Sequence, residues 1–191
     1  MKNKGGNKMN DSRTKSMIKI ALMTSIMCVI APFTLPLPFT PIPISMANLI
    51  IYISCCILGT KKGTMSLILY LLIGVFGLPV FSGFSGGLSK LAGPTGGYIL
   101  GFIFCAVLTG LFVDKFEDKI YMYPVGMILG TIICYVFGTA WLAFQLKLGF
   151  AQAMFMGVIP YLLGDILKIA VSTILGYTLR HRLKSINLIS A

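Results

Sequence analysis

Six long apolar segments constrain this chain more than any other feature of its sequence. They cover residues 17–35, 44–59, 63–79, 97–114, 121–145 and 151–179. About 20 consecutive apolar residues cross the hydrocarbon core of a bilayer as a helix. Hydrophobic residues make up 57% of the 191 residues, more than a soluble domain of this size could bury. The sequence therefore predicts an all-α integral membrane protein, a compact bundle of six transmembrane helices.

The bundle is expected to form one domain, because no connection is long enough to separate two. We predict a disordered basic N-terminal tail over residues 1–15, the six-helix membrane domain over 16–182, and a cytoplasmic C-terminal tail over 183–191. The first apolar segment follows basic residues, as in a secretory signal. It lacks a convincing small-residue cleavage site, so we expect it to be retained as the first helix.

The basic residues indicate how the chain lies in the membrane. The formal net charge is +11, and 13 of the 16 basic residues lie in alternate segments on one side of the predicted bundle. Cytoplasmic loops of membrane proteins carry this excess, so both termini are expected in the cytoplasm. The charge is a topology signal, and no nucleic-acid partner is expected. The 13 residues are Lys2, Lys4, Lys8, Arg13, Lys15, Lys19, Lys61, Lys62, Lys115, Lys119, Arg180, Arg182 and Lys184.

Catalytic and metal-binding chemistry lack the necessary residues. All five cysteines lie in apolar segments, without a Cys-x-x-Cys pair, and are typical of small packing residues. The single histidine, His181, lies in the basic tail and is expected to be solvated. One histidine supports neither a metal site nor a Ser-His or Cys-His nucleophile. We therefore expect no catalytic residues, no metal ligands and no cofactor.

Asp165 and Lys168 are the only charges in the last apolar segment, and Asp165 is the only acid in the interior of any of the six, since Asp114 is the terminal residue of the fourth. Three residues apart, they share one face of a helix. A charge inside a bilayer costs about 2.5–3.5 kcal/mol on insertion scales, so such residues usually serve a function. Two interpretations remain open from the residues alone. The pair either binds a ligand or forms an internal ion pair that fixes the last helix.

Small residues at four-residue spacing indicate close helix packing. One ladder comprises Gly97, Gly101, Cys105 and Thr109, and another comprises Gly126, Gly130, Cys134 and Gly138. Such faces let helix backbones approach each other, and we expect both ladders to pack within the bundle.

A shorter element of the same kind, Ala21 and Ser25, lies near the cytoplasmic end of the first helix. Its spacing fits either internal packing or a docking face for another membrane protein.

Two stiff segments are expected on the outer side of the membrane. Residues 77–97 contain seven of the 21 glycines, together with Phe81 and other apolar residues that suit a lid better than a solvated loop. Residues 34–45 are rich in proline and also apolar. Neither segment contains a dinucleotide or Walker A motif. The sequence therefore predicts Gly/Pro-rich outer loops that cap an outward-facing pocket.

These motifs resemble those of the BioY family, the biotin-specific S-components of energy-coupling factor (ECF) transporters. The resemblance is most specific in GLPVFSGFSGGLSKLAGPTGGYILGF, residues 77–102. It extends to PFTPIPIS at 38–45, LGTKKGTMS at 58–66 and the Asp-x-x-Lys motif in LLGDILKIAV at 162–171. Ala21 and Ser25 resemble the family's Ala-x-x-x-Ala docking element, with serine in place of the second alanine.

The resemblance implies a multi-pass subunit of a bacterial or archaeal cell membrane that binds biotin and delivers it inward. Asp165 would accept from the ureido N–H groups of biotin, and Lys168 would donate to the ureido oxygen. Further substrate contacts are expected where the family pattern and the outer loops place polar or aromatic groups. Ser85, Lys90 and Tyr98 are candidates for the carboxylate, Phe81 for the rings, and Asn48 for a polar contact of the first loop.

The resemblance also implies partners. Ala21 and Ser25 would contact a transmembrane coupling subunit, which paired ATPase subunits drive, since this chain has no nucleotide-binding motif. Two alternatives stay open, a stand-alone small-molecule transporter and an S-component for another vitamin. A membrane enzyme is disfavoured because Asp165 has no second catalytic group. A stand-alone transporter is disfavoured because only one span carries ionisable groups and no internal repeat is visible.

Overall fold

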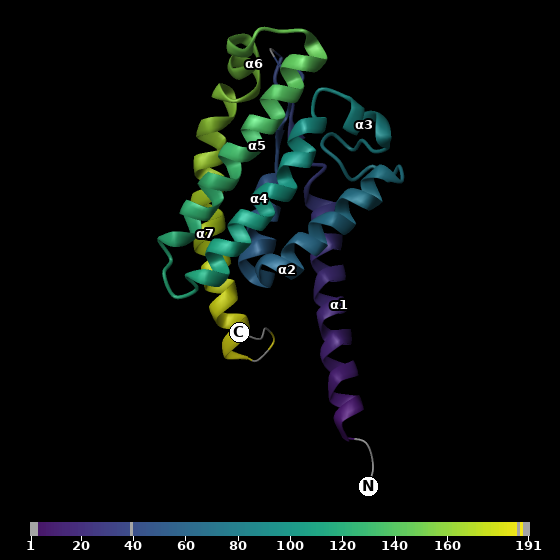
Figure 1. Cartoon of the computed structure of the whole chain (residues 1–191), viewed down its shortest axis with the longest axis vertical. Helices are drawn as coiled ribbons and strands as arrows, with labels where there is room; N and C mark the ends of the chain where they lie inside the picture. The colour runs from purple at the N-terminus through teal and green to yellow at the C-terminus, as the bar shows by residue number, and fades with distance from the viewer. Residues whose placement is uncertain (1–3, 39, 187, 189–191) are drawn as a thin grey trace.

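The computed structural model describes residues 4–38, 40–186 and 188, and within them the chain is mostly helical (Figure 1). Helix α1 (Lys4–Ile30) begins inside the segment for which the composition predicts disorder. Helix α7 (Leu162–Ser185) ends at the same end of the bundle at which α1 begins (Figure 1). The elements between them are β1 (Thr34–Leu35), β2 (Ile44–Ser45), α2 (Ala47–Val75), α3 (Leu88–Ala92), α4 (Gly96–Lys115), α5 (Met122–Leu146), α6 (Phe150–Gly157) and the 3₁₀ helix η1 (Ile159–Tyr161).

The predicted all-α membrane fold is confirmed, with two differences in how the spans are built. The second and third predicted spans form one helical element, α2, which bends at Gly59, where φ is +75°. This backbone conformation is open to glycine at little cost. The sixth span is divided, because α6 and α7 meet at η1, which contains Pro160. In the described part of the chain, α2, α4, α5 and the α6–α7 run are long and apolar enough to cross a membrane.

Helices α4 and α5 pack through their small-residue ladders, as the sequence predicts. A Cβ added to Gly101 would lie 2.9 Å from the Cα of Cys134, and one added to Gly130 would lie 3.0 Å from the Cα of Cys105. Real Cβ atoms essentially never show the first distance, and the second is tighter than nine in ten real Cβ contacts, so the two backbones meet where glycine leaves room. Both predicted ladders are therefore intramolecular.

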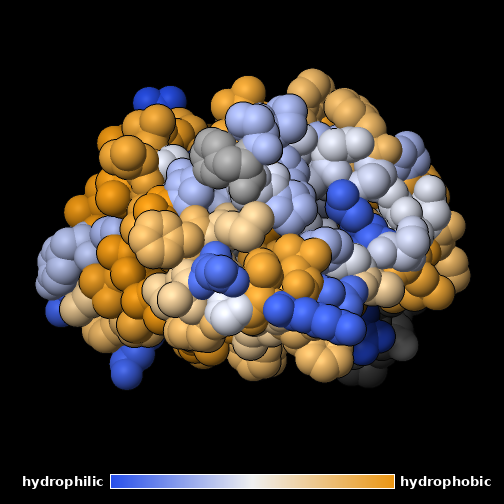
Figure 2. Space-filling model, turned by 90° about the horizontal axis from the view of Figure 1, so that it is seen from above, coloured by the Kyte–Doolittle hydropathy of each residue, from blue (hydrophilic) through white to orange (hydrophobic). Residues whose placement is uncertain are grey.

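The two outer segments contact each other above the helices. Strands β1 and β2 pair antiparallel, with Thr34 opposite Ser45. The N–H of Gly83, in the glycine-rich segment, donates to the carbonyl of Pro32 at 3.0 Å, and the ring of Phe84 meets that of Phe33 edge-on. Seen from this end, hydrophilic residues gather across the middle and hydrophobic residues cover the flanks (Figure 2). The outer loops therefore form one cap rather than two separate lids.

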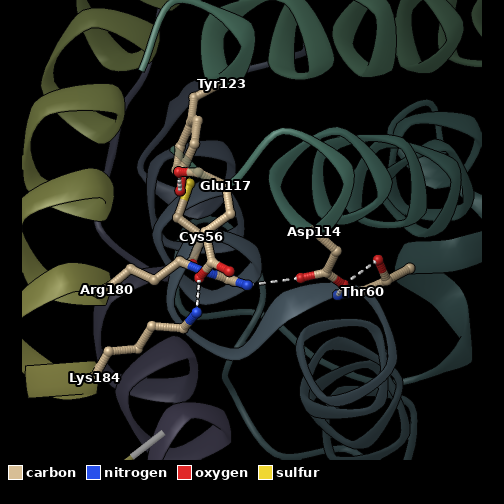
Figure 3. Close-up of polar contacts among 7 residues, drawn as sticks. All are labelled: Cys56, Thr60, Asp114, Glu117, Tyr123, Arg180 and Lys184. Atoms are coloured by element: carbon tan, nitrogen blue, oxygen red, sulfur yellow. Dashed lines mark hydrogen bonds and ion pairs between the residues drawn. The ribbon is translucent and has the colours of Figure 1, made fainter. Parts of the chain in front are cut away.

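The opposite end of the bundle is held by a buried arginine. Arg180 of α7, one of the basic residues from which the topology is predicted, is only 5% exposed. Its guanidinium donates to Glu117 at 2.7 Å, to Asp114 at 3.0 Å and to the carbonyl of Cys56 at 2.9 Å (Figure 3). Arg180 thereby joins α7 to the α4–α5 connection and to α2 just before its bend.

The acids of this network have further partners. Asp114 accepts from the N–H and the hydroxyl of Thr60, at 2.8 and 2.7 Å, and so satisfies the first donors after the bend at Gly59. Lys184 also pairs with Glu117, at 2.5 Å. Burial would raise the pKa of Glu117, but Lys184 and Arg180 outweigh it and hold this pKa below its ordinary value of 4.5. The stabilisation from ionised Glu117 is thus present above that value and is lost as the pH falls through the lowered pKa.

His181 also differs from its predicted solvated state. Its side chain is half-buried, and its ring meets that of Tyr177 edge-on at 4.2 Å between centroids.

Candidate substrate-binding site

The charged pair lies in the first turns of α7, where the last span resumes after its break. Asp165 and Lys168 are 4% and 7% exposed. The Lys168 ammonium donates to Asp165 Oδ1 at 3.0 Å. Because the two charges share one helix face, they partly neutralise each other in a membrane-embedded site. The pair occupies the wall of a cavity that the helices enclose beneath the outer cap.

The cavity brings together six of the seven substrate contacts that the sequence predicts. Ser85 does not line it; the Ser85 hydroxyl donates to the carbonyl of Ser82 at 2.8 Å instead. The six residues come from α2, the outer loop, α3, α4 and α7, so the site is assembled from segments far apart in the sequence. They are Asn48, Phe81, Lys90, Tyr98, Asp165 and Lys168.

The outer wall of the cavity is supplied by the glycine-rich segment. Phe81 is 2% exposed and meets the ring of Tyr70 edge-on, so this part of the predicted lid is packed rather than mobile in solvent. Lys90 lies on α3, on the side of the bundle opposite α7 (Figure 1). Trp141 of α5 donates to the carbonyl of Gly93 at 2.9 Å and anchors the connection between α3 and α4.

Two hydroxyl groups add polar atoms to this wall. The hydroxyl of Tyr98, on the first turn of α4, donates to the carbonyl of Gly157 at 3.0 Å. Thr95 also lines the cavity, and its buried hydroxyl has no hydrogen-bond partner among the described residues. A buried polar group without a partner is costly, so a ligand acceptor at this position would be stabilising.

Sequence reasoning missed the tyrosines that surround the charged pair. The Tyr135 hydroxyl, from α5, donates to Asp165 Oδ2 at 2.5 Å. Tyr161, in η1, donates to the carbonyl of Ile42 and to the hydroxyl of Thr40, which ties the first outer loop to the break in the last span. Both tyrosines line the cavity. A phenolic group within an apolar span is the available signal, but eight tyrosines occur in the chain and nothing local distinguishes these two.

The predicted docking residues lie far from this cavity. Ala21 and Ser25 are exposed on α1, and the Ser25 hydroxyl donates to the Ala21 carbonyl at 2.9 Å. Met23 and Thr24, on the other face of the same turn, are buried against the bundle. The small-residue face of α1 is therefore turned outward, which excludes internal packing of Ala21 and Ser25 in this structure.

The arrangement suits a small elongated ligand with polar groups at both ends. Asp165 offers acceptors and Lys168 offers donors on one wall, while Lys90 and Thr95 offer donors from other elements. Aromatic and aliphatic side chains, among them Phe81, cover the space between them. The fold and the cavity thus define a membrane-embedded protein that binds small molecules.

Comparison with known proteins identifies which family this is. The model of the BioY family matches residues 1–185, and the chain belongs to the BioY family. The biotin transporter BioY of Thermotoga maritima is 33% identical over 87% of this chain and 96% of its own length. The biotin transporter BioY of Rhizobium etli is also 33% identical, over 85% and 91%.

A solved structure agrees with the fold. The crystal structure at 2.1 Å of the S-component for biotin from an ECF-type ABC transporter matches with a TM-score of 0.83 and 28% identity. The match covers 90% of this chain and 94% of that one. The all-α membrane bundle predicted from the sequence therefore has the fold of that S-component.

Proposed function

We propose that this protein is the biotin-binding membrane subunit of an ECF-type importer, a transport protein rather than an enzyme. The observation that carries the proposal is the buried Asp165–Lys168 pair on the wall of the cavity beneath the cap. The ureido head of biotin has N–H donors and one strong carbonyl acceptor. An ionised aspartate accepts only and a lysine donates only, so the pair complements both.

The other groups of the cavity match the rest of biotin. Its carboxylate needs donors, which the ammonium of Lys90 and the unpartnered hydroxyl of Thr95 supply. Its fused rings and aliphatic chain are apolar, and Phe81 and Tyr98 provide apolar surface. Asn48, at the start of α2, adds one further polar contact.

Equilibrium binding by the purified protein tests the proposal. We expect biotin to bind most tightly, desthiobiotin to bind more weakly because it lacks the sulfur of the second ring, and thiamin not to bind. Thiamin is a cation, and a cavity with Lys90, Lys168 and a single acid repels it. Tight thiamin binding without biotin binding would favour an S-component for another vitamin.

We propose that both termini face the cytoplasm. The excess of basic residues on one side supports this orientation, since α1 begins and α7 ends at the same end of the bundle (Figure 1). Ser89 and Ser185 are both exposed. Cysteines introduced there should react with an impermeant maleimide from outside at position 89 only, with the unsubstituted protein as background. Labelling of position 185 from outside intact cells would contradict this orientation.

We further propose that Ala21 and Ser25 contact a transmembrane coupling subunit driven by paired ATPases. Their outward-facing small side chains leave a groove against which a partner helix can pack. Ala21→Trp should fill the groove, abolish assembly and ATP-dependent uptake, and leave biotin binding by the isolated subunit unchanged.

Ile128→Trp is the matched control for this substitution. Ile128 is an exposed apolar residue on another helix, α5, and should tolerate tryptophan. Retention of assembly in Ala21→Trp, or equal loss in both variants, would place the contact elsewhere.

A further inference from the structure

The Asp165 carboxylate has a second hydrogen-bond donor within the chain, the hydroxyl of Tyr135 on another helix. The ligand contacts proposed above do not explain this hydrogen bond. Tyr135 of α5 donates to Asp165 Oδ2 at 2.5 Å, while Lys168 of α7 donates to Oδ1 at 3.0 Å. Asp165 is buried, and Tyr135 is half-buried and lines the same cavity. One oxygen of the carboxylate is therefore bound from α7, its own helix, and the other from α5.

The Tyr135 contact restrains the carboxylate in a way that Lys168 alone does not. Lys168 reaches Asp165 from the same helix through a flexible four-carbon stem, which can follow the carboxylate as it turns. Tyr135 is a rigid ring on α5 and fixes the position of the second oxygen. A carboxylate has about four acceptor sites, and two of them are used by these donors. The remaining sites then keep a fixed direction for an N–H donor of a ligand.

We propose that Tyr135 is a positioning residue for substrate recognition, which aims the Asp165 carboxylate at the N–H groups of the bound head group. The inference rests on the proposed function, because it takes the ureido head of biotin as that group. Tyr135 acts through Asp165, because Tyr135 contacts the carboxylate and the carboxylate contacts the ligand head. Pre-organised acceptors raise affinity because the cost of orienting them is met during folding rather than on binding.

The Tyr135→Phe variant tests the proposal, since it removes the hydroxyl and keeps the ring. Loss of one hydrogen bond to a charged group should weaken biotin binding by about 10- to 100-fold. Desthiobiotin should lose the same factor, because it has the same ureido head.

Tyr52→Phe is the matched control. It also removes a buried tyrosine hydroxyl, which bonds Thr131 at 2.6 Å, but Tyr52 does not line the cavity. We expect this variant to bind biotin as the unsubstituted protein does. Biotin affinity that is unchanged in Tyr135→Phe, or reduced equally in Tyr52→Phe, would overturn the proposal.

A double-variant cycle separates positioning from a general change in cavity shape. If Tyr135 acts through Asp165, Tyr135→Phe should cost no further affinity once Asp165→Asn is present. Independent, additive losses would overturn the proposal. Infrared spectra of the ligand-free protein give a second readout that needs no binding. Tyr135→Phe should shift the carboxylate stretching band that Asp165→Asn removes, and an unshifted band would equally overturn it.

These readouts also distinguish this inference from the proposed function. If the unsubstituted protein fails to bind biotin, the proposed function fails, and the infrared band still decides whether Tyr135 orients Asp165. If the unsubstituted protein binds biotin and Tyr135→Phe binds it equally well, the proposed function stands and this inference fails.

Discussion

Asp165→Asn should weaken biotin binding by about 2–5 kcal/mol, which corresponds to a roughly 30- to 4,000-fold increase in Kd. The substitution keeps the shape of the side chain but replaces a charged, acceptor-only group by an amide that both donates and accepts. It also leaves the buried ammonium of Lys168 without its counter-ion. Equilibrium binding to purified protein, with labelled biotin as the probe, measures the change.

Asp118→Asn is the control for this prediction. It removes one acidic charge from the exposed α4–α5 connection, away from the cavity, and should leave the Kd unchanged. Thermal unfolding of both variants checks that the fold is retained. Unchanged biotin affinity in a folded Asp165→Asn protein would mean that the pair serves as an internal ion pair that fixes α7.

The parts of the site that could be predicted from the sequence depend on local spacing. Asp165 and Lys168 are three residues apart, so a helix is enough to bring them together. Tyr135 lies 30 residues from Asp165, and only the packing of α5 beside α7 brings its hydroxyl to the carboxylate. The same limit applies to Ser85, which shares the glycine-rich motif but is turned toward the carbonyl of Ser82.

The fold is likewise predictable where it depends on local sequence, and not where it depends on contacts between distant residues. Hydropathy and basic loops define how many times the chain crosses the membrane, because the bilayer demands apolar helices of a set length. They do not show that α2 continues through its bend, since the bend depends on the single φ of Gly59 and on Asp114, which binds the first donors after it. Nor do they show which basic residues are buried, because burial depends on partners distant in the sequence.

Arg180 makes several such contacts with residues distant in the sequence, and we expect them to contribute strongly to the free energy of unfolding. Its partners Glu117 and Asp114 lie 63 and 66 residues away, and the Cys56 carbonyl lies 124 residues away. Removing one partner of a buried ion pair costs about 3–5 kcal/mol. Because 42% of the Asp114 side chain and 21% of that of Glu117 are exposed, water can solvate the acids left behind. We therefore expect Arg180→Gln to lower the free energy of unfolding by about 3 kcal/mol, the lower end of this range.

Arg182→Gln provides the comparison, because Arg182 is exposed two residues further along α7. It removes the same charge from the same end of the bundle and should change the free energy of unfolding by less than about 0.5 kcal/mol. Equilibrium unfolding in mixed detergent micelles measures both variants. Equal stability of the two would mean that the contacts of Arg180 do not stabilise the fold. A selective loss in Arg180→Gln would mean that α7, which carries Asp165 and Lys168, is held in place from the end opposite the cavity.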